Sequence, residues 1–468
     1  MGQASRLFNG NAEQTLYSRI TPTTEQREFL QTQWNALAEH LKADLASCGY
    51  PISTWLQGSY KYGTLIKPVH LGEEYDVDVG VYFEWDPEET EVAPTPGQLR
   101  QWVQREIHTY KETNDALKVV EEPAKERCSR AVYVKQFHID TPTYHLNTDT
   151  EERRLACLSG KWEDSDPKAL YKWFKNVVSG DDRDQLRRII RYLKGWAAVA
   201  FVGAPESRPS SIVLTVAAAE AYEGMWLARF GGIADDDALI AVVKKLYERL
   251  NEDRKVLNPI DSDEDLNRIA TEAWAPFLTR LNILHDAAIS ADEAEDEAGA
   301  AFAWSEALSF LMPLPEIDEV EVLETSSGRA LMVLPEIQVQ VFNTANEQLI
   351  ATFMNEVPGV ERNRKLIFTI MNPHVVPDFG VVEWTVRNDG ADAEQLGDLG
   401  HAQGGIGLIS TVEHTAYIGK HYMDCVVRCN GSVYAARRIP VNIKPSGQQL
   451  LAKARTSWTR LRSRRGRR

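Results

Sequence analysis

Long apolar runs are missing from this chain of 468 residues. A membrane-spanning helix needs about twenty consecutive, predominantly apolar residues, so we expect no membrane span. The N-terminal sequence MGQASRLFNGNAEQ also lacks the apolar stretch of a signal peptide. It begins Met-Gly with Ser5 near the position of a myristoylation motif, and we interpret this short match as chance. These absences predict a cytoplasmic protein with no membrane partner.

Cysteine is scarce. The number is odd and the positions are scattered, so a disulfide framework is not expected and a reducing compartment fits better. Two of the cysteines lie four residues apart in a strand-like stretch, but no second pair accompanies them, and a zinc site is not expected there. The five are Cys48, Cys128, Cys157, Cys425 and Cys429.

Positive charge is also in deficit, with 52 Lys and Arg against 68 Asp and Glu and a net charge of −16. This balance disfavours broad, nonspecific binding of nucleic acid by the whole surface. Residues 446–468 are the exception, because they contain many Arg and Lys and no acids. A solvated tail is the favoured interpretation. An electrostatic handle for nucleic acid, nucleotide or a partner is the alternative.

The patterning of apolar residues divides the chain into parts. Its length allows two or three domains, and its 43% hydrophobic content is enough for each to bury a core. A helix and several alternating strands come first, a series of long helical patterns follows, and strands separated by Gly-Asp-Asn turns come last. We expect a catalytic lobe at 1–165, a helical lobe at 166–312, a connector at 313–363, a β domain resembling a small sandwich at 364–445, and the basic tail at 446–468.

One stretch carries most of the chemistry. Gly58 and Ser59 open GSYKYGT at an expected helix start, where backbone N–H groups, a hydroxyl and the helix dipole can bind phosphate. Asp76 and Asp78 follow in DVDVGVYF, which alternates as a strand does, so both carboxylates point to the same face. Such a pair can hold Mg²⁺, which prefers oxygen ligands and substrate phosphates. Phosphoryl transfer needs both features, and a second ion would clamp the reacting oxygens.

A third carboxylate is expected from a neighbouring strand, and FHIDTPTYHL supplies Asp140. Each piece alone has an ordinary explanation. A D-x-D pair is usually a solvated strand face, a GSxxxGT string is an ordinary turn and helix start, and Asp140 could cap a turn before Pro142. The three occurring together, in this order and with these apolar flanks, predict an active site.

These motifs resemble those of the DNA polymerase β-like nucleotidyltransferases. The string QGSYKYGTLIKPV…EYDVDVGVYF, with RRIIRYLKGWAAV, RPSSIVLTVAAAEAY and VLNPIDSDEDLNRI after it, is similar to the CD-NTases, bacterial enzymes of antiphage defence related to cyclic GMP-AMP synthase. The similarity covers about residues 15–310. Residues from about 364 to 445 resemble, less specifically, the AGS-C-like sensor domain attached to some of these enzymes.

The resemblance implies an α+β fold: a bilobed polymerase β-like core with a helical lobe, plus a C-terminal all-β sandwich-like domain. It implies that Asp76, Asp78 and Asp140 bind two Mg²⁺ ions, with Mn²⁺ as a substitute, and that Gly58 and Ser59 bind phosphate. It also places Lys194 and either Ser210 or Ser211 on the triphosphate. From the residues alone, Lys194 is about as well explained as a surface cation, and the two serines as caps of the next helix.

The implied activity is synthesis of a cyclic di- or trinucleotide second messenger from nucleoside triphosphates, ATP or GTP among them, with release of pyrophosphate. The alternatives are a template-independent polymerase or tRNA-end nucleotidyltransferase, which the acidic balance disfavours, and a non-catalytic ligand-sensing protein, which the intact aspartates disfavour. No Cys/His counterpart of the DNA-sensing zinc insert of animal relatives is present. A regulatory ligand or protein is expected at the β domain. Base choice, ring size and linkage depend on pocket shape and follow from no motif.

Overall fold

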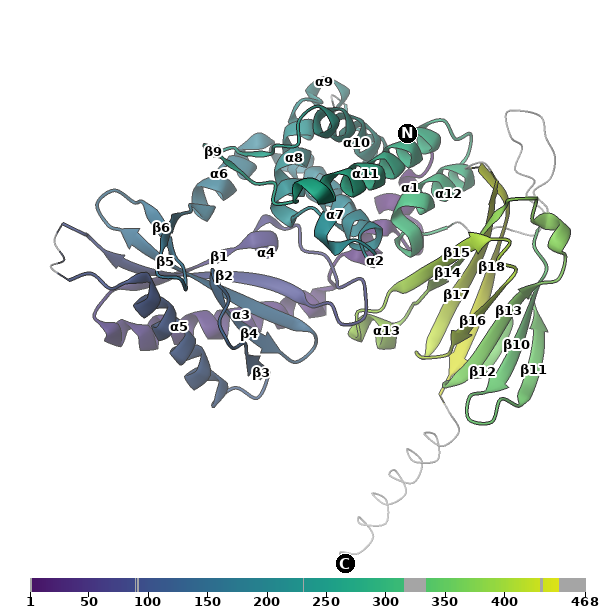
Figure 1. Cartoon of the computed structure of the whole chain (residues 1–468), viewed down its shortest axis with the longest axis horizontal. Helices are drawn as coiled ribbons and strands as arrows, with labels where there is room; N and C mark the ends of the chain where they lie inside the picture. The colour runs from purple at the N-terminus through teal and green to yellow at the C-terminus, as the bar shows by residue number, and fades with distance from the viewer. Residues whose placement is uncertain are drawn as a thin grey trace, which may run out of the picture. The chain divides into compact units, whose positions relative to one another are not determined.

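The computed structural model describes residues 2–88, 90, 92–229, 231–314, 334–429 and 432–445. The chain divides into two compact units. The first comprises Met1–Glu293 with Glu306–Leu308, and the second comprises Ala294–Ser305 with Ser309–Arg468. Figure 1 shows mixed helices and strands in the first unit and mainly strands in the second. The predicted basic tail, 446–468, lies outside the described residues.

A seven-stranded mixed sheet forms the base of the first unit, with strand order β1-β2-β5-β4-β3 and with β6 and β7 continuing from β5. Strands β2 and β5 run parallel, whereas β1 with β2 and β4 with β5 are antiparallel. The strands are Ile52–Gln57 (β1), Tyr75–Trp85 (β2), Leu117–Val120 (β3), Cys128–Tyr133 (β4), Phe137–Asn147 (β5), Arg153–Ala156 (β6) and Trp162–Asp164 (β7).

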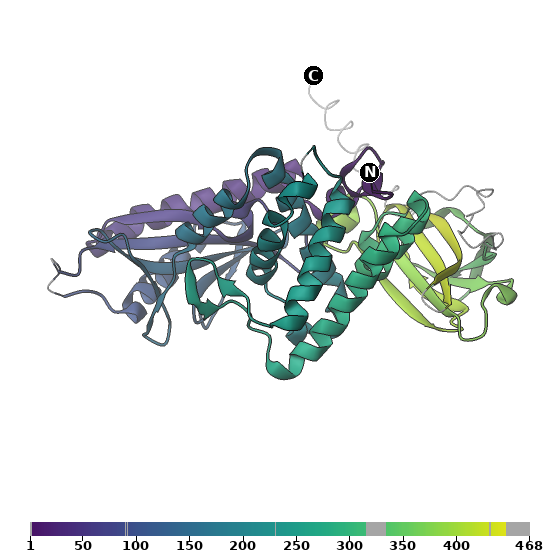
Figure 2. The same ribbon diagram turned by 90° about the horizontal axis from the view of Figure 1, so that it is seen from above.

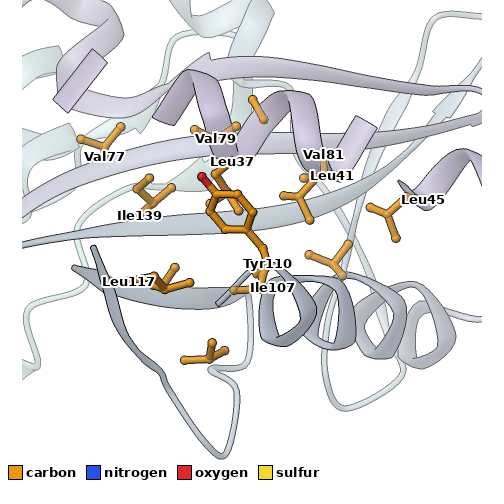
Figure 3. Packing of buried hydrophobic residues seen from close by; sticks show 14 of the residues in the cluster. Leu37, Leu41, Leu45, Val77, Val79, Val81, Ile107, Tyr110, Leu117 and Ile139 are labelled. Carbon is orange, nitrogen blue, oxygen red and sulfur yellow. The ribbon is translucent and has the colours of Figure 1, made fainter. Parts of the chain in front are cut away.

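Two helices cover one face of this sheet. They are α3 (Thr24–Leu45) and α5 (Pro96–Lys111), and each begins with a threonine capping box. Leu37 and Leu41 of α3 pack with Val77 and Val79 of β2 in the core between them, as Figure 3 shows. Because side chains alternate along a strand, burial of the valines on this face leaves the aspartates of DVDV on the other.

Helices dominate the rest of the first unit (Figure 2). The change of pattern that the sequence predicts near residue 165 corresponds to α6, which starts at Pro167. The helices are α1 (Ser5–Asn9), α2 (Leu16–Ile20), α4 (Gly58–Tyr62), α6 (Pro167–Val177), α7 (Gly180–Ala200), α8 (Ser211–Glu223), α9 (Trp226–Arg229), α10 (Asp235–Glu252) and α11 (Thr271–Asp292), with the hairpin β8 (Leu257–Asn258) and β9 (Asp261–Asp265) between α10 and α11. None of the helices in the described residues is both long and apolar enough to cross a membrane.

The second unit contains two β-sheets that share one apolar core. One sheet has the order β11-β10-β13-β16 and the other β12-β18-β17-β14-β15. The elements are α12 (Glu297–Leu308), which spans both units, β10 (Ile337–Asn343), β11 (Leu349–Met354), β12 (Val357–Glu361), β13 (Arg364–Ile370), β14 (Val381–Arg387), α13 (Ala391–Gln395), β15 (Gly400–Ile406), β16 (Ser410–His414), β17 (Gly419–Cys429) and β18 (Ser432–Lys444). The predicted fold class, α+β with a C-terminal sandwich-like domain, is confirmed.

Three strands, β10 to β12, lie within the predicted connector at 313–363, and this differs from the expectation. The stretch IQVQVFN alternates apolar and polar residues, and Ile337, Val339 and Val341 are buried. Strand β10 then pairs with both β11 and β13. The β domain therefore begins before Arg364, where the sequence pattern had placed its start.

Candidate active site

The parallel pairing of β2 with β5 brings the predicted acidic residues together. In the register of these strands Asp76 lies opposite His138, and Asp78 lies opposite Asp140. All four are on the sheet face opposite the α3–α5 core, because the valines and isoleucine between them are buried there. The ligand atoms of Asp76, His138 and Asp140 lie within 4.8 Å of one another. This is the cluster, among the described residues, that could hold a metal ion.

The turn from β1 into α4 lies close to Asp78. Gly58 follows the last residue of β1 and has φ of +60°, in the left-handed region that favours glycine. A Cβ atom on Gly58 would lie 1.8 Å from the Asp78 Oδ2 atom. The turn is closed by a backbone hydrogen bond in which the Thr64 N–H donates to the Ser59 carbonyl at 2.9 Å. Glycine is thus required here both for conformation and for the close approach of the carboxylate.

The electrostatics of the cluster suit a cation. Burial and the nearby carboxylates of Asp76 and Asp140 raise the pKa of the Asp78 carboxyl well above its usual value. Burial also opposes ionisation of Asp76, but the hydrogen bond from the His138 ring and the positive charges of His138, Arg130 and Lys125 together outweigh it and hold the Asp76 pKa low. A bound divalent cation would remove the repulsion at Asp78. The residues present therefore fit a metal that prefers oxygen ligands.

Two neighbours already engage the acidic residues. The His138 Nε2 atom lies 2.9 Å from Asp76 Oδ1, and its Nδ1 atom lies 2.8 Å from Glu74 Oε2. On the other side Arg130 of β4 donates two hydrogen bonds to Asp140, at 2.6 and 2.8 Å. Asp140 thus lies beside Asp78, as the sequence analysis expected, but both of its oxygens are held by the guanidinium.

Lys194 lies on α7 and is buried, with 5% of its surface exposed. Its ammonium group donates to the Thr64 carbonyl at 3.2 Å and to the Thr64 hydroxyl at 3.0 Å. Burial, together with the positive charge of Arg191, lowers the pKa of Lys194 to about 7. Lys194 is therefore not a solvated surface charge, and its burial excludes the surface role that the sequence left open.

The two serines at the start of α8 lie in different settings. Ser210 is the N-cap residue, and its hydroxyl accepts from the Val213 N–H at 3.5 Å. Ser211 is the first residue of the helix and is exposed. Of the two, Ser211 lines the cavity described next. The cap therefore occupies one hydroxyl and leaves the other available.

A cavity of about 470 Å³ joins these elements. This volume is within the range of small-molecule and cofactor sites. Asp140 is not among its lining residues, so the structure places it beside the cavity rather than in its wall. The predicted residues that line it are Gly58, Ser59, Asp76, Asp78, Lys194 and Ser211.

Several lining or adjacent residues were not predicted from the sequence. Arg208 and Glu73 face each other in the wall, with 3.5 Å between Arg208 Nη1 and Glu73 Oε1, and Lys67 also lines the cavity. His138 could have been found, because it lies two residues before Asp140 and so on the same strand face. Arg208 and Glu73 are 135 residues apart, and no periodicity relates them.

Comparison with known proteins matches two parts of the chain to family models. Residues 52–144 match the model "Cyclic GMP-AMP synthase DncV-like, nucleotidyltransferase domain". Residues 321–444 match the "Adenylyl/Guanylyl and SMODS C-terminal sensor domain". Both matches agree with the resemblance to the CD-NTases. The first match contains Gly58 and all three aspartates, and the second contains strands β10 to β18.

Curated relatives cover most of the chain. A cyclic GMP-AMP synthase of Escherichia albertii is 29% identical over 93% of this chain and 95% of its own length. A c-di-GMP synthase of Roseivirga ehrenbergii is 24% identical over 60% of this chain and 80% of its own length. Among solved structures, the Vibrio cholerae cyclic AMP-GMP synthase with a linear intermediate has a TM-score of 0.55 at 19% identity, covering 67% of this chain and 97% of that one. This last likeness shows the shared fold.

The low pKa of Lys194 predicts a pH-dependent affinity for triphosphate. In the free cavity Lys194 is largely charged below pH 7 and largely neutral above it. A triphosphate favours the charged form, so above pH 7 binding must take up a proton and weakens by about tenfold per pH unit. We expect the loss of affinity caused by Lys194→Met to be much larger at pH 6.5 than at pH 8.5. Titrations of both proteins across this range also correct for ionisation of the triphosphate. An equal loss at both pH values would contradict the role.

Proposed function

We propose that this chain is a CD-NTase that joins nucleoside triphosphates into a cyclic di- or trinucleotide second messenger and releases pyrophosphate, in bacterial antiphage signalling. The observation that carries the proposal is the position of Asp76, Asp78 and Asp140 on one face of two paired strands, with Asp76 and Asp78 lining a cavity of about 470 Å³. The relatives named as cyclic GMP-AMP and c-di-GMP synthases support the same class of product.

The residues around the cavity offer three kinds of group to a triphosphate: backbone N–H groups, a positive charge and a hydroxyl. Gly58 and Ser59 open α4, where free backbone N–H groups can hydrogen-bond phosphate oxygens. Lys194 adds a positive charge from a buried position, which strengthens its effect on a phosphate. Ser211 offers a hydroxyl at the start of α8. Together these groups orient the α-phosphate toward the acidic face of the sheet.

Asp76, Asp78 and Asp140 would hold two divalent cations, Mg²⁺ or Mn²⁺, which supply neutralisation of the triphosphate and activation of the attacking hydroxyl. His138 fixes the orientation of the Asp76 carboxylate through its hydrogen bond. Arg130 fixes that of Asp140. The proposed reaction is attack of a 2′- or 3′-hydroxyl on an α-phosphate, followed by a second attack that closes the ring.

A primer experiment separates this activity from the alternatives. The protein is incubated with Mg²⁺ and four nucleoside triphosphates, with and without an RNA primer or tRNA, and pyrophosphate and product length are followed. The proposal predicts pyrophosphate release without a primer and small products that resist phosphatase. Extension of the primer alone would indicate a polymerase or tRNA-end nucleotidyltransferase, and absence of pyrophosphate would indicate a non-catalytic protein.

The adjacent serines allow a matched test of the triphosphate site. Ser210→Ala removes the cap of α8 and is expected to lower the free energy of unfolding by about 1 kcal/mol with little change in KM. Ser211→Ala removes a lining hydroxyl and is expected to raise KM several-fold without loss of stability. Denaturant unfolding and steady-state kinetics on both variants check this. The reverse assignment would show that Ser210 is the hydroxyl that contacts triphosphate.

A further inference from the structure

A second, smaller cavity lies inside the C-terminal unit. Its volume is about 90 Å³, and both sheets contribute to its wall. Leu366 and Phe368 come from one sheet, and Met423 and Val441 come from the other. Since one water molecule needs about 10–15 Å³ on this measure, the space holds roughly six or more waters, which is comparable to one small heteroaromatic ring system.

Three histidines that are scattered in the sequence line this cavity: His401, His414 and His421. His421 is structural. Its Nε2 atom lies 3.0 Å from the Tyr417 carbonyl, and its Nδ1 atom accepts from the Asp389 N–H at 3.2 Å. Burial lowers the pKa of His421, so it is neutral at physiological pH. It therefore shapes the wall and adds no charge.

Two carboxylates lie in the same wall. Glu413 Oε1 lies 2.9 Å from the His401 Nε2 atom, and Asp398 Oδ2 accepts from the Tyr417 hydroxyl at 2.6 Å. The second oxygen of each carboxylate makes no hydrogen bond to any described residue. Neither lysine nor arginine occurs among the described lining residues. This wall can accept hydrogen bonds from N–H groups. The hydrogen bond with Glu413 raises the pKa of His401, so that ring partly offsets the charge of Glu413, and the described lining residues offer a phosphate no lysine or arginine.

Asn388 supplies the observation that points to a ligand. It follows the end of β14, lines the cavity and is 9% exposed. Its backbone N–H donates to the Leu399 carbonyl at 3.1 Å, but its side-chain amide has no hydrogen-bond partner among the described residues. Because Asn388 lines the cavity, a molecule bound there can satisfy this amide. Its donor and acceptor together match the edge of an amino-substituted ring, as asparagine does with adenine.

We propose that this cavity binds a small, uncharged, amino-substituted heteroaromatic ring of the size of a nucleobase. The apolar side chains contact its faces, the Asn388 amide pairs with its edge, and the Asp398 and Glu413 carboxylates accept from its amino and ring N–H groups. The site lies wholly in the C-terminal unit and is independent of the proposed nucleotidyl transfer. It gives this sensor domain a ligand class defined by hydrogen-bond donors and lack of negative charge.

Calorimetry on the full-length chain tests the proposal with bases that differ in one group. Adenine and hypoxanthine differ at the amino group, as do cytosine and uracil. We expect one amino-bearing base to bind at one site per chain, and its oxo counterpart to bind at least tenfold more weakly. Asn388→Leu, which removes the amide at similar volume, should weaken the base by at least tenfold. Glu413→Gln should also weaken it and tests the site independently if Asn388→Leu fails to fold.

Two control variants locate the binding. Thr352 lies on β11 outside the cavity, and Lys194 lines the cavity beside the acidic residues of the first unit, so Thr352→Ala and Lys194→Met serve as controls. Neither should change the affinity for the base. The proposal is overturned if neither adenine nor cytosine binds at millimolar concentration, or if the oxo bases bind equally well. It is also overturned if Lys194→Met removes the binding while Asn388→Leu and Glu413→Gln leave it unchanged.

Discussion

Replacing Asp76 and Asp78 together by asparagine is expected to lower nucleotidyl transfer by about 10³-fold or more while the fold is retained. The amide oxygens keep the shape of the side chains but remove two negative charges from the site that would hold the cations. Because burial and repulsion raise the Asp78 pKa, removing its charge relieves unfavourable electrostatics, whereas removing the charge of Asp76 gives up its favourable interaction with His138. These two effects oppose each other, so we expect thermal stability to change little.

Binding of Mn²⁺, measured by calorimetry or electron paramagnetic resonance, gives a readout that does not depend on turnover. The Asp76→Asn, Asp78→Asn protein should lose the Mn²⁺ affinity that the wild type shows with a triphosphate present. Asp149→Asn, which changes an exposed carboxylate outside the cavity, is the matched control and should leave both metal binding and turnover intact. Full turnover in a folded double variant would remove the aspartates from the active site.

The second large effect is expected at Gly58, where alanine should lower turnover by about 10²-fold. A Cβ atom there would lie 1.8 Å from Asp78 Oδ2, so the carboxylate or the turn must move by an ångström or more. Displacements of this size at a reacting centre cost about 10²-fold in rate. The left-handed φ of +60° adds a backbone cost of about 1–2 kcal/mol.

Gly49→Ala separates the clash from the backbone cost. Gly49 has φ of +91°, but nothing lies within 4 Å of a Cβ atom built on it. Gly49→Ala should therefore lose, in denaturant unfolding, the stability that corresponds to the backbone cost, Gly58→Ala should lose at least as much, and Gly58→Ala alone should lose turnover. If Gly49→Ala and Gly58→Ala reduced turnover equally, the loss would come from destabilisation, and the close approach to Asp78 would have no special role.

The sequence predicted those parts of the site that depend on local pattern. Alternation in DVDVGVYF is enough to place Asp76 and Asp78 on one face. The valines between them are buried on one side of the strand, so the aspartates at the alternate positions lie on the other side. The expectation that Asp140 lies on a neighbouring strand agrees with the register of β2 and β5. Local pattern sufficed because both motifs lie on long strands with strongly apolar flanks.

Other features depend on tertiary contacts that no local pattern encodes. The capture of Asp140 by Arg130 follows from the antiparallel register of β4 with β5. The hydrogen bond of Lys194 with Thr64 joins residues 130 positions apart. From the sequence Lys194 could have been a surface cation, whereas in the structure it is buried. In the second unit, β10 to β12 were assigned to a connector. IQVQVFN alternates as a strand does, but its pairing with β11 and β13 is a tertiary contact that no local pattern shows.

The most direct test of the central claim is identification of the product by mass. Purified protein is incubated with the four nucleoside triphosphates and Mg²⁺, treated with phosphatase, and analysed beside the Asp76→Asn, Asp78→Asn variant. The account predicts a phosphatase-resistant product with the mass of a cyclic di- or trinucleotide, formed by the wild type and absent from the variant. No cyclic product from the wild type under any combination of triphosphates, or the same product from the folded variant, would contradict it.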